Sequence, residues 1–231
     1  MKHLCAVSII ILSVSACADQ TLDAAQSSGT SQETTRSATA QSVPTTSVPN
    51  SVSGSSMRWS HVTGSEGWQT FVEEAIDLHG ESLRNSTPSD IANWCPAFAG
   101  QTPEERKAFW SYLMSSLMKF ESNYDTTVSF QESFNDRFGN PVISRGLLQL
   151  SKESANGYGC GIGDPKELHD PKTNLQCSVR IMNRWLDRDG AIVRKTAPNK
   201  WRGFARYWSP FRSKSKLKTM QQQVADSSYC R

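Results

Sequence analysis

The sequence reads Phe120-Glu121-Ser122-Asn123-Tyr124 at the end of an apolar stretch and, after a polar segment, Ser144-Arg145-Gly146-Leu147-Leu148-Gln149-Leu150. The apolar stretch opens at Thr102-Pro103-Glu104-Glu105, where a threonine can cap a helix, a proline suits its first turn and a glutamate completes a capping box. The apolar side chains that follow recur at helical spacing: Phe109, Leu113, Leu117 and Phe120. The pattern predicts a helix that starts after Thr102, is buried over most of its girth and ends at Glu121.

Helical patterns also dominate the rest of the chain after residue 57. Apolar spacing predicts a helix over Glu66–His79, and Asp170-Pro171 opens another. Weaker helical patterns cover Trp201–Trp208 and Lys216–Val224. Two segments rich in Gly, Asn and Ser are predicted as loops or short irregular elements: residues 123–141 and 144–163. We therefore expect a mainly α-helical domain with irregular loops or short strands around a cleft.

The first residues are those of an export signal. Met1-Lys2-His3 is positively charged, and Leu4–Val14 is apolar but too short to span a bilayer as a stable anchor. Small residues then precede Cys17, so residues 1–16 are predicted as a lipoprotein signal peptide whose removal leaves Cys17 lipidated. The alternative is an ordinary signal peptide with a chance cysteine. Because Ala18 follows the cysteine, the lipoproteins that this one resembles predict a place in the outer membrane, facing the periplasm.

Composition divides the exported chain into a tether and one domain. Residues 17–56 are rich in Ser and Thr and have too little apolar surface to fold, so we expect a lipidated, flexible tether. Residues 57–231 are the size of one domain. Nine Lys or Arg and no Asp or Glu fall between Gly190 and Ala225, which is typical of a solvated face. Attraction to an anionic wall or membrane surface is the alternative, while nucleic acid is not an expected partner of an exported lipoprotein.

Four cysteines remain after the signal peptide and Cys17 are set aside. In an oxidising compartment an even number predicts two disulfides, for which three connectivities exist. We favour Cys160–Cys177, which closes a short loop, and Cys95–Cys230, which ties down the C-terminus. Close C-x-x-C pairs, which would indicate a metal site, are absent from the sequence.

Glu121 is the candidate catalytic residue. Most glutamates are ordinary surface residues, but this one ends a mostly apolar helix and is followed by loops suited to a cleft wall. Apolar neighbours raise the pKa of a carboxyl group, because burial disfavours its charged form. A carboxyl group that stays protonated near neutral pH is what a general acid for glycosidic cleavage needs.

Three motifs in this order resemble those of the lytic transglycosylases of the soluble-lytic-transglycosylase type, which have a lysozyme-like fold. Phe120–Tyr124 is similar to their glutamate–serine motif. Gly146–Leu150 resembles their Gly-Leu-Met-Gln motif, and Ser144 precedes it where the family often has a serine. Asp170–Leu175 looks like their Asp-Pro-x-x-Asn-Ile helix start. The resemblance covers about Leu113 to Trp208, which is most of the domain.

Two features depart from the family pattern. In the expected Ala-Tyr-Asn motif, Tyr207 matches the tyrosine, which in the family lies near the catalytic acid, but Trp208 stands where the asparagine would be. The loop from Asn123 to Ser144 is longer than is usual and contains Glu132 and Asp136.

The resemblance implies cleavage of the β-1,4 bond between N-acetylmuramic acid (MurNAc) and N-acetylglucosamine (GlcNAc), with peptidoglycan glycan strands as the partner. Glu121 would protonate the bridging oxygen and then, as a carboxylate, accept a proton from the muramic C6 hydroxyl, which closes on C1 to give a 1,6-anhydro end. Six residues are expected to bind substrate or orient the acid: Ser144, Gly146, Leu148, Gln149, Tyr207 and Trp208. For these, hydrogen bonding within the loops and core packing are the competing interpretations.

Two other functions remain open. A hydrolytic muramidase of the same fold would need a carboxylate to activate water, for which Asp125, Glu132 and Asp136 are candidates. A non-catalytic glycan-binding lipoprotein is supported only by the missing asparagine. No cofactor and no metal are expected, because His61, His79 and His169 lack metal-ligand spacing, and the sequence has no G-x-S-x-G segment of a serine hydrolase.

Overall fold

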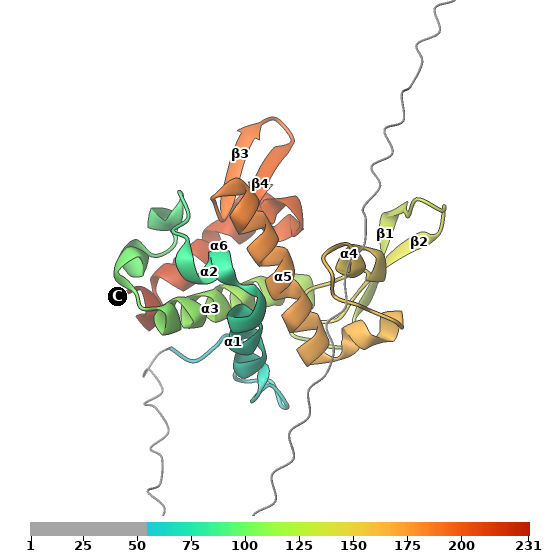
Figure 1. Ribbon diagram of the computed structural model, residues 1–231, viewed down its shortest axis with the longest axis horizontal. Coiled ribbons are helices and arrows are strands. Elements are labelled where there is room, and N and C mark those ends of the chain that lie inside the picture. The colour runs from blue at the N-terminus through green and yellow to red at the C-terminus, as the bar shows by residue number, and fades with distance from the viewer. Residues whose placement is uncertain (1–54) are drawn as a thin grey trace, which may run out of the picture. The chain divides into compact units, whose positions relative to one another are not determined.

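Helix α3 (Pro103–Glu121) runs through the core of the domain (Figure 1). This computed structural model describes residues 55–231, so the predicted signal peptide, Cys17 and nearly all of the tether lie outside the described residues. The capping box predicted for α3 is confirmed. The Thr102 hydroxyl accepts a hydrogen bond from the Glu105 N–H at 3.3 Å, and the Glu105 carboxylate accepts one from the Thr102 N–H at 2.7 Å.

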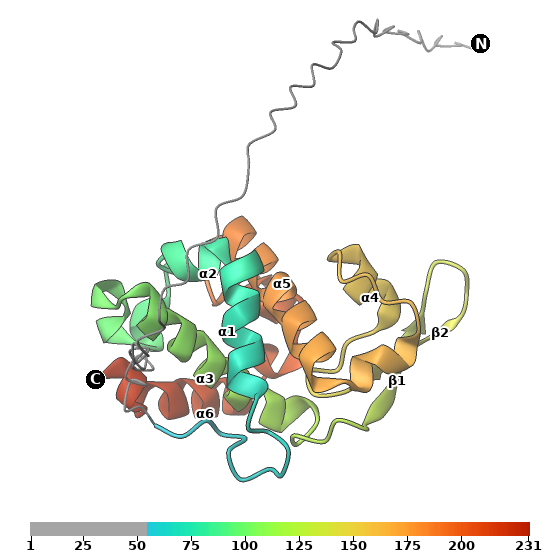
Figure 2. The ribbon, with the colours of Figure 1, turned by 60° about the horizontal axis from the view of Figure 1, so that its bottom comes forward.

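The burial predicted for α3 is also confirmed. Every residue from Ala108 to Met118 is buried, so this helix has no solvent-facing stripe over three turns. Four other helices lie around it, and α1 packs against both α3 and α5 (Figure 2). They are α1 (Trp68–His79), α2 (Glu81–Asn85), α5 (Pro171–Asp189) and α6 (Lys214–Ala225). The helices predicted over Glu66–His79, from Asp170 onward and over Lys216–Val224 are therefore confirmed.

Short elements complete the domain. A sixth α-helix, α4, covers Lys152–Gly157 in a segment predicted as irregular. Two antiparallel hairpins form separate sheets: β1 (Ser129–Asn135) with β2 (Pro141–Arg145), and β3 (Val193–Ala197) with β4 (Lys200–Gly203). Single turns of 3₁₀-helix cover Ile91–Asn93, Pro96–Gly100, Pro165–His169, Phe204–Arg206, Ser209–Arg212 and Ser228–Cys230. The mainly helical, lysozyme-like fold with short strands is the one expected from the sequence.

The prediction of a helix over Trp201–Trp208 is wrong. The segment begins as strand β4 and continues as a 3₁₀ turn. At Gly203 the chain takes φ +63°, and the carbonyl oxygens of Ala191 and Ile192 stand 2.3 Å from where a Cβ would lie. The Gly203 N–H donates to the Asp189 carboxylate at 2.7 Å. This close approach of two backbones breaks a pattern that apolar spacing alone assigns to a helix.

Residues 123–141, predicted as loops or short irregular elements, contain strand β1, one of the short strands expected around the cleft. Six of its seven residues are exposed, so the strand carries no alternation of buried and exposed side chains. Period-two hydrophobicity is the main sequence signal for a strand, and here it is missing. Val142 and Ile143, which follow this segment, are part of β2.

Both favoured disulfides are present. Cys95–Cys230 joins the segment before α3 to the C-terminus, and Cys160–Cys177 joins the chain after α4 to α5. At the start of the described residues, the Ser55 carbonyl accepts a hydrogen bond from the Tyr229 hydroxyl at 2.8 Å. Within residues 55–231, none of the helices combines the length and the apolar character that crossing a bilayer requires.

Candidate active site

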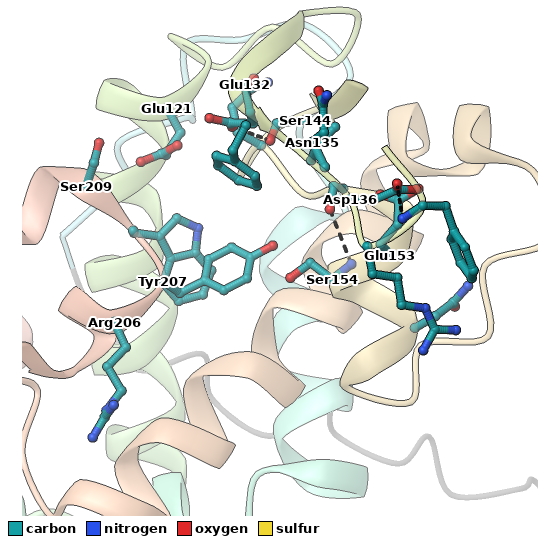
Figure 3. A pocket seen from close by; sticks show the side chains of 18 of the residues that line it. Glu121, Glu132, Asn135, Asp136, Ser144, Glu153, Ser154, Arg206, Tyr207 and Ser209 are labelled. Atoms are coloured by element: carbon teal, nitrogen blue, oxygen red, sulfur yellow. Dashed lines mark hydrogen bonds between the residues drawn. The ribbon is translucent and has the colours of Figure 1, made fainter. Parts of the chain in front are cut away.

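A cavity of about 900 Å³ opens where the end of α3, the β1–β2 hairpin, α4 and residues 206–212 meet (Figure 3). Glu121 lies on one side of it and Asp136, at the hairpin tip, on the other. Of the residues expected at the site, four line the cavity besides Glu121: Ser144, Gln149, Tyr207 and Trp208. No group of three or more His, Cys, Asp or Glu side chains that could hold a metal ion occurs among residues 55–231.

The Glu121 carboxyl group is poised as an acid. Burial raises its pKa from an ordinary 4.5 to about 7, and the negative charge of Glu132 acts in the same direction, while Lys216 and Arg212 lower the pKa. Its Oε1 atom is buried without a hydrogen-bond partner in the described part of the chain. Because Glu121 is the last residue of α3, the helix dipole also disfavours its negative charge. At neutral pH this carboxyl group is therefore protonated in a large fraction of the molecules.

Glu132 is a second carboxylate in the same cavity, and the sequence indicated it only as one of three candidates for activating water. It lies on β1 and accepts a hydrogen bond from the Ser144 hydroxyl at 2.6 Å. Strand register explains the pair: Phe130 lies opposite Ser144, so Glu132, two residues on, shares its face of the hairpin. Ser144 is thus a partner of Glu132 rather than of Glu121. Only the strand pairing, which the sequence did not reveal, could have predicted this contact.

Asn174 at the start of α5 holds the turn from Arg145 to Leu150. Its side-chain amide donates to the carbonyls of Arg145 at 3.0 Å and Leu168 at 2.8 Å, and its side-chain oxygen accepts from the Leu148 N–H at 3.0 Å. The turn itself closes through paired backbone hydrogen bonds between Arg145 and Leu150. The motif resemblance at Asp170–Leu175 therefore corresponds to a bracing role for Asn174, which the sequence did not assign.

Gly146 and Leu148 were expected to bind substrate, and the structure corrects both expectations. Neither residue lines the cavity. The Leu148 side chain is fully buried in the core. Gly146 sits at φ +70°, in a space where a Cβ would lie 2.1 Å from the Leu168 carbonyl oxygen. Glycine is required at position 146 because the backbone of Leu168 lies so close to it. Leucine at position 148 fills space in the core.

Gln149 lines the cavity and also supports the turn. It adopts φ +48°, which is uncommon for a residue with a side chain. Its side-chain amide donates to the Gly146 carbonyl at 2.8 Å and to the Val128 carbonyl at 3.3 Å. Both hydrogen bonds go to the protein backbone. This agrees with the alternative interpretation of Gln149, in which its side chain stabilises the loop. The strained backbone conformation is typical of a residue held in place at a functional site.

Tyr207 and Trp208 differ in how they reach the cavity. Trp208 is buried, and its indole N–H donates to the Leu148 carbonyl at 3.0 Å. Trp208 therefore packs in the core and braces the same turn as Asn174. Tyr207 is half-buried, and its hydroxyl points toward Ser154 on α4 (Figure 3). Burial raises the pKa of this hydroxyl, so Tyr207 stays a neutral donor beside the acid.

Part of the basic run between residues 190 and 225 belongs to this site rather than to a solvated face. Arg206 forms a half-buried ion pair with Asp189, with Nε 2.6 Å from the carboxylate, and this fixes the segment that carries Tyr207. Arg212 lines the cavity, and the ammonium group of Lys216 lies 5.5 Å from the Phe120 ring. Both cations lower the pKa of Glu121, so they limit the rise that burial causes.

Comparison with known proteins identifies similar solved structures. No protein-family model matches the chain, and no curated protein matches it. The wild-type form 2 of Bd0314 DslA, a Bdellovibrio protein, is 41% identical with a TM-score of 0.72, over 76% of this chain and 98% of that one. Two mutants of DslA match equally well, at 41% identity and TM-scores of 0.72 and 0.71. Each replaces one glutamate with glutamine, at positions eleven apart in that protein.

Proposed function

The chain belongs to the family of Bd0314 DslA, and on this premise we propose that it cleaves the MurNAc–GlcNAc β-1,4 bond of peptidoglycan. The observation that carries the proposal is the Glu121 carboxyl group, whose pKa burial raises to about 7 at the wall of a large open cavity. A carboxyl group in this state can deliver a proton to a glycosidic oxygen at neutral pH.

The first step is the same for every product. The Glu121 proton moves to the bridging oxygen, the bond from that oxygen to C1 of MurNAc breaks, and GlcNAc leaves with a hydroxyl group. The ring carbon is left electron-poor, as in the oxocarbenium-like transition state of glycosidases. Glu121 becomes a carboxylate, and Arg212 and Lys216, which favour its charged form, stabilise it.

We propose hydrolysis as the second step, because Glu132 is available as a base. In an inverting glycosidase a second carboxylate takes a proton from water while the water oxygen bonds to C1. Glu121 and Glu132 are eleven positions apart, the same separation as the two glutamates replaced in the DslA mutants. The Ser144 hydroxyl holds Glu132 in place for this role. The enzyme would then be a muramidase.

Lytic transglycosylation is the second candidate, and the three motifs that resemble the soluble-lytic-transglycosylase type favour it. In this reaction the substrate's acetamido group stabilises C1 after the bond breaks. The Glu121 carboxylate then takes a proton from the C6 hydroxyl of MurNAc, and the C6 oxygen bonds to C1. The product is a 1,6-anhydro end, and no water is consumed. Glu132 takes no part in this reaction.

Product analysis separates the two reactions. Purified peptidoglycan is digested with the wild-type protein and with Glu132→Gln, and the muropeptides are read by mass spectrometry. Hydrolysis gives reducing MurNAc ends, and these are expected to fall at least about 10²-fold in Glu132→Gln. Anhydro ends from both proteins would establish the transglycosylase instead. Glycan binding without products from the wild-type protein would leave a binding lipoprotein as the surviving function.

The pH dependence of cleavage is expected to report Glu121. The acid must be protonated at the start of the reaction, so the rate should fall as pH rises through about 7. Lys216→Met removes a cation that lowers the pKa of Glu121, and it should therefore move this alkaline limb to higher pH. Rates measured from pH 5 to 9 check both expectations. An alkaline limb that stays in place in Lys216→Met would contradict the assignment of the limb to Glu121.

We also propose that lipid on Cys17 holds the enzyme at the outer membrane, facing the periplasm, with the glycan strands as its partner. The support lies in residues 1–18 of the sequence. Cys17→Ser is expected to release the protein from the membrane fraction and to abolish incorporation of labelled palmitate. Release of the protein by salt alone, with no lipid attached, would contradict this placement.

A further inference from the structure

The β1–β2 hairpin exposes an unusual amount of aromatic surface. Phe130, Phe134 and Phe138 are 61%, 59% and 74% exposed, and Leu78 is the one other large apolar side chain so exposed among residues 55–231. Phe134 and Phe138 line the cavity that holds Glu121, while Phe130 does not. Aromatic side chains left in solvent on one hairpin beside a cavity indicate a ligand surface.

The tip of the hairpin is built to hold Phe138 in place. The Asp136 carboxylate accepts hydrogen bonds from the N–H groups of Phe138 and Asn140, both at 2.8 Å. Gly139 takes φ +87°, as the turn requires. The Arg137 guanidinium lies 4.6 Å from the centre of the Phe138 ring. The backbone that carries Phe138 is therefore fixed by the turn, so a ligand does not have to order the hairpin tip on binding.

The wall that accompanies these rings is polar. Asn135 and Asp136 come from the hairpin, and Glu153, Ser154 and Asn156 come from α4 (Figure 3). Asp136 and Asn156 are bonded within the protein, to the hairpin turn and to Ile162, so Asn135, Glu153 and Ser154 are the ones that can offer donors and acceptors to a ligand. An aromatic face beside such a wall matches a pyranose ring, which has an apolar face of C–H groups and an edge of hydroxyl and acetamido groups. An acyl chain would cover the Asn135 and Glu153 side chains without pairing them, which is costly.

We propose that Phe134 and Phe138 form a sugar-stacking subsite at the hairpin end of the cleft, which binds a glycan ring away from the bond that Glu121 protonates. The subsite deepens the proposed function and rests on it for the identity of the ligand. We expect it to favour long glycan strands over short fragments, because Asp136, at the hairpin tip beside Phe138, lies on the other side of the cavity from Glu121. Phe134 and Phe138 are specificity-determining residues, since they do not touch the reacting atoms.

Binding to GlcNAc oligomers tests the subsite without any need for turnover. Isothermal titration with the hexamer and the trimer compares three proteins, all in a Glu121→Gln background. They are the parent, the double variant Phe134→Ala/Phe138→Ala and the control Phe130→Ala, which removes an equally exposed ring of the same hairpin outside the cavity. The double variant should bind the hexamer at least tenfold more weakly than the parent and lose the gain in affinity from trimer to hexamer. The control should stay within twofold.

The outcomes separate this subsite from the proposed reaction. Equal loss of affinity in the control and the double variant, or no loss in either, overturns the subsite. In the wild-type background, the double variant should raise KM for peptidoglycan strands with little change in kcat, because stacking acts away from the bond that breaks. Hexamer binding that depends on the two rings, together with no cleavage of peptidoglycan by the wild-type protein, would overturn the reaction and leave the subsite standing.

Discussion

Glu121→Gln is expected to lower peptidoglycan cleavage by about 10²–10⁴-fold, the usual contribution of a general acid. Glutamine keeps the size and the hydrogen-bonding oxygen of the side chain but has no proton to transfer. The assay is the release of soluble muropeptides from purified peptidoglycan, at a pH below 7 where the wild-type carboxyl group is protonated. Glu74→Gln, the same change at an exposed position of α1, is the matched control and should leave the rate unchanged.

The same substitution should stabilise the fold at alkaline pH. The pKa of Glu121 is about 7 in the folded state, against 4.5 for an ordinary glutamate, so the protonated form is the one that folding favours. The favourable contribution is complete below pH 4.5 and is lost as pH rises through about 7. At pH 8 the wild-type protein carries the full cost of a buried charge, and glutamine does not. We expect Glu121→Gln to raise the free energy of unfolding by about 1–3 kcal/mol at pH 8.

Unfolding curves measured at two pH values test this expectation. The difference between the wild type and Glu121→Gln should be large at pH 8 and close to zero at pH 4, because protonated Glu121 resembles glutamine. Glu74→Gln should show no such dependence on pH. If Glu121→Gln still cleaved peptidoglycan at the wild-type rate, Glu121 would not be the acid of the reaction, whatever the stability of the variant.

The acid and its helix could be predicted because their determinants are local. Thr102 and Glu105 specify the start of α3 within one turn, and apolar spacing carries the pattern to Glu121. Capping and periodicity act over a few residues, so they can be read without knowledge of the fold. The desolvation that raises the pKa of Glu121 followed from the apolar character of that helix.

The second carboxylate and the bracing of the turn could be predicted less well, because both depend on contacts between distant segments. Glu132 meets Ser144 only through strand register, on a strand whose exposed residues carry no periodic signal. Asn174 and Trp208 reach the turn from segments 26 and 60 residues away from Leu148. Each of these residues was visible in the sequence, but the partner of each is set by tertiary packing.

Gly146→Ala is expected to destabilise the fold by more than backbone strain alone. At φ +70° an alanine is strained, which costs about 1–2 kcal/mol. Its Cβ would also lie 2.1 Å from the Leu168 carbonyl oxygen and 2.7 Å from the Asn174 side-chain nitrogen, and overpacking of this kind costs about 1–3 kcal/mol. Neither neighbour is the free end of a flexible chain, since Asn174 is held by three hydrogen bonds. We expect a total loss of roughly 2–5 kcal/mol in the free energy of unfolding.

Gly161→Ala is a matched control, because Gly161 has the same φ of +70° but no atom of the described chain within 4 Å of its Cβ position. It should show the backbone strain alone, about 1–2 kcal/mol. The excess loss in Gly146→Ala, measured by urea unfolding of both variants, is then the cost of pushing Asn174 and the Leu168 carbonyl apart. Since Asn174 holds the turn that carries Gln149, cleavage by the folded fraction of Gly146→Ala should also fall, whereas Gly161→Ala should cleave normally. Equal losses of stability in the two variants would mean that the turn yields easily, and that Asn174 does not brace the site.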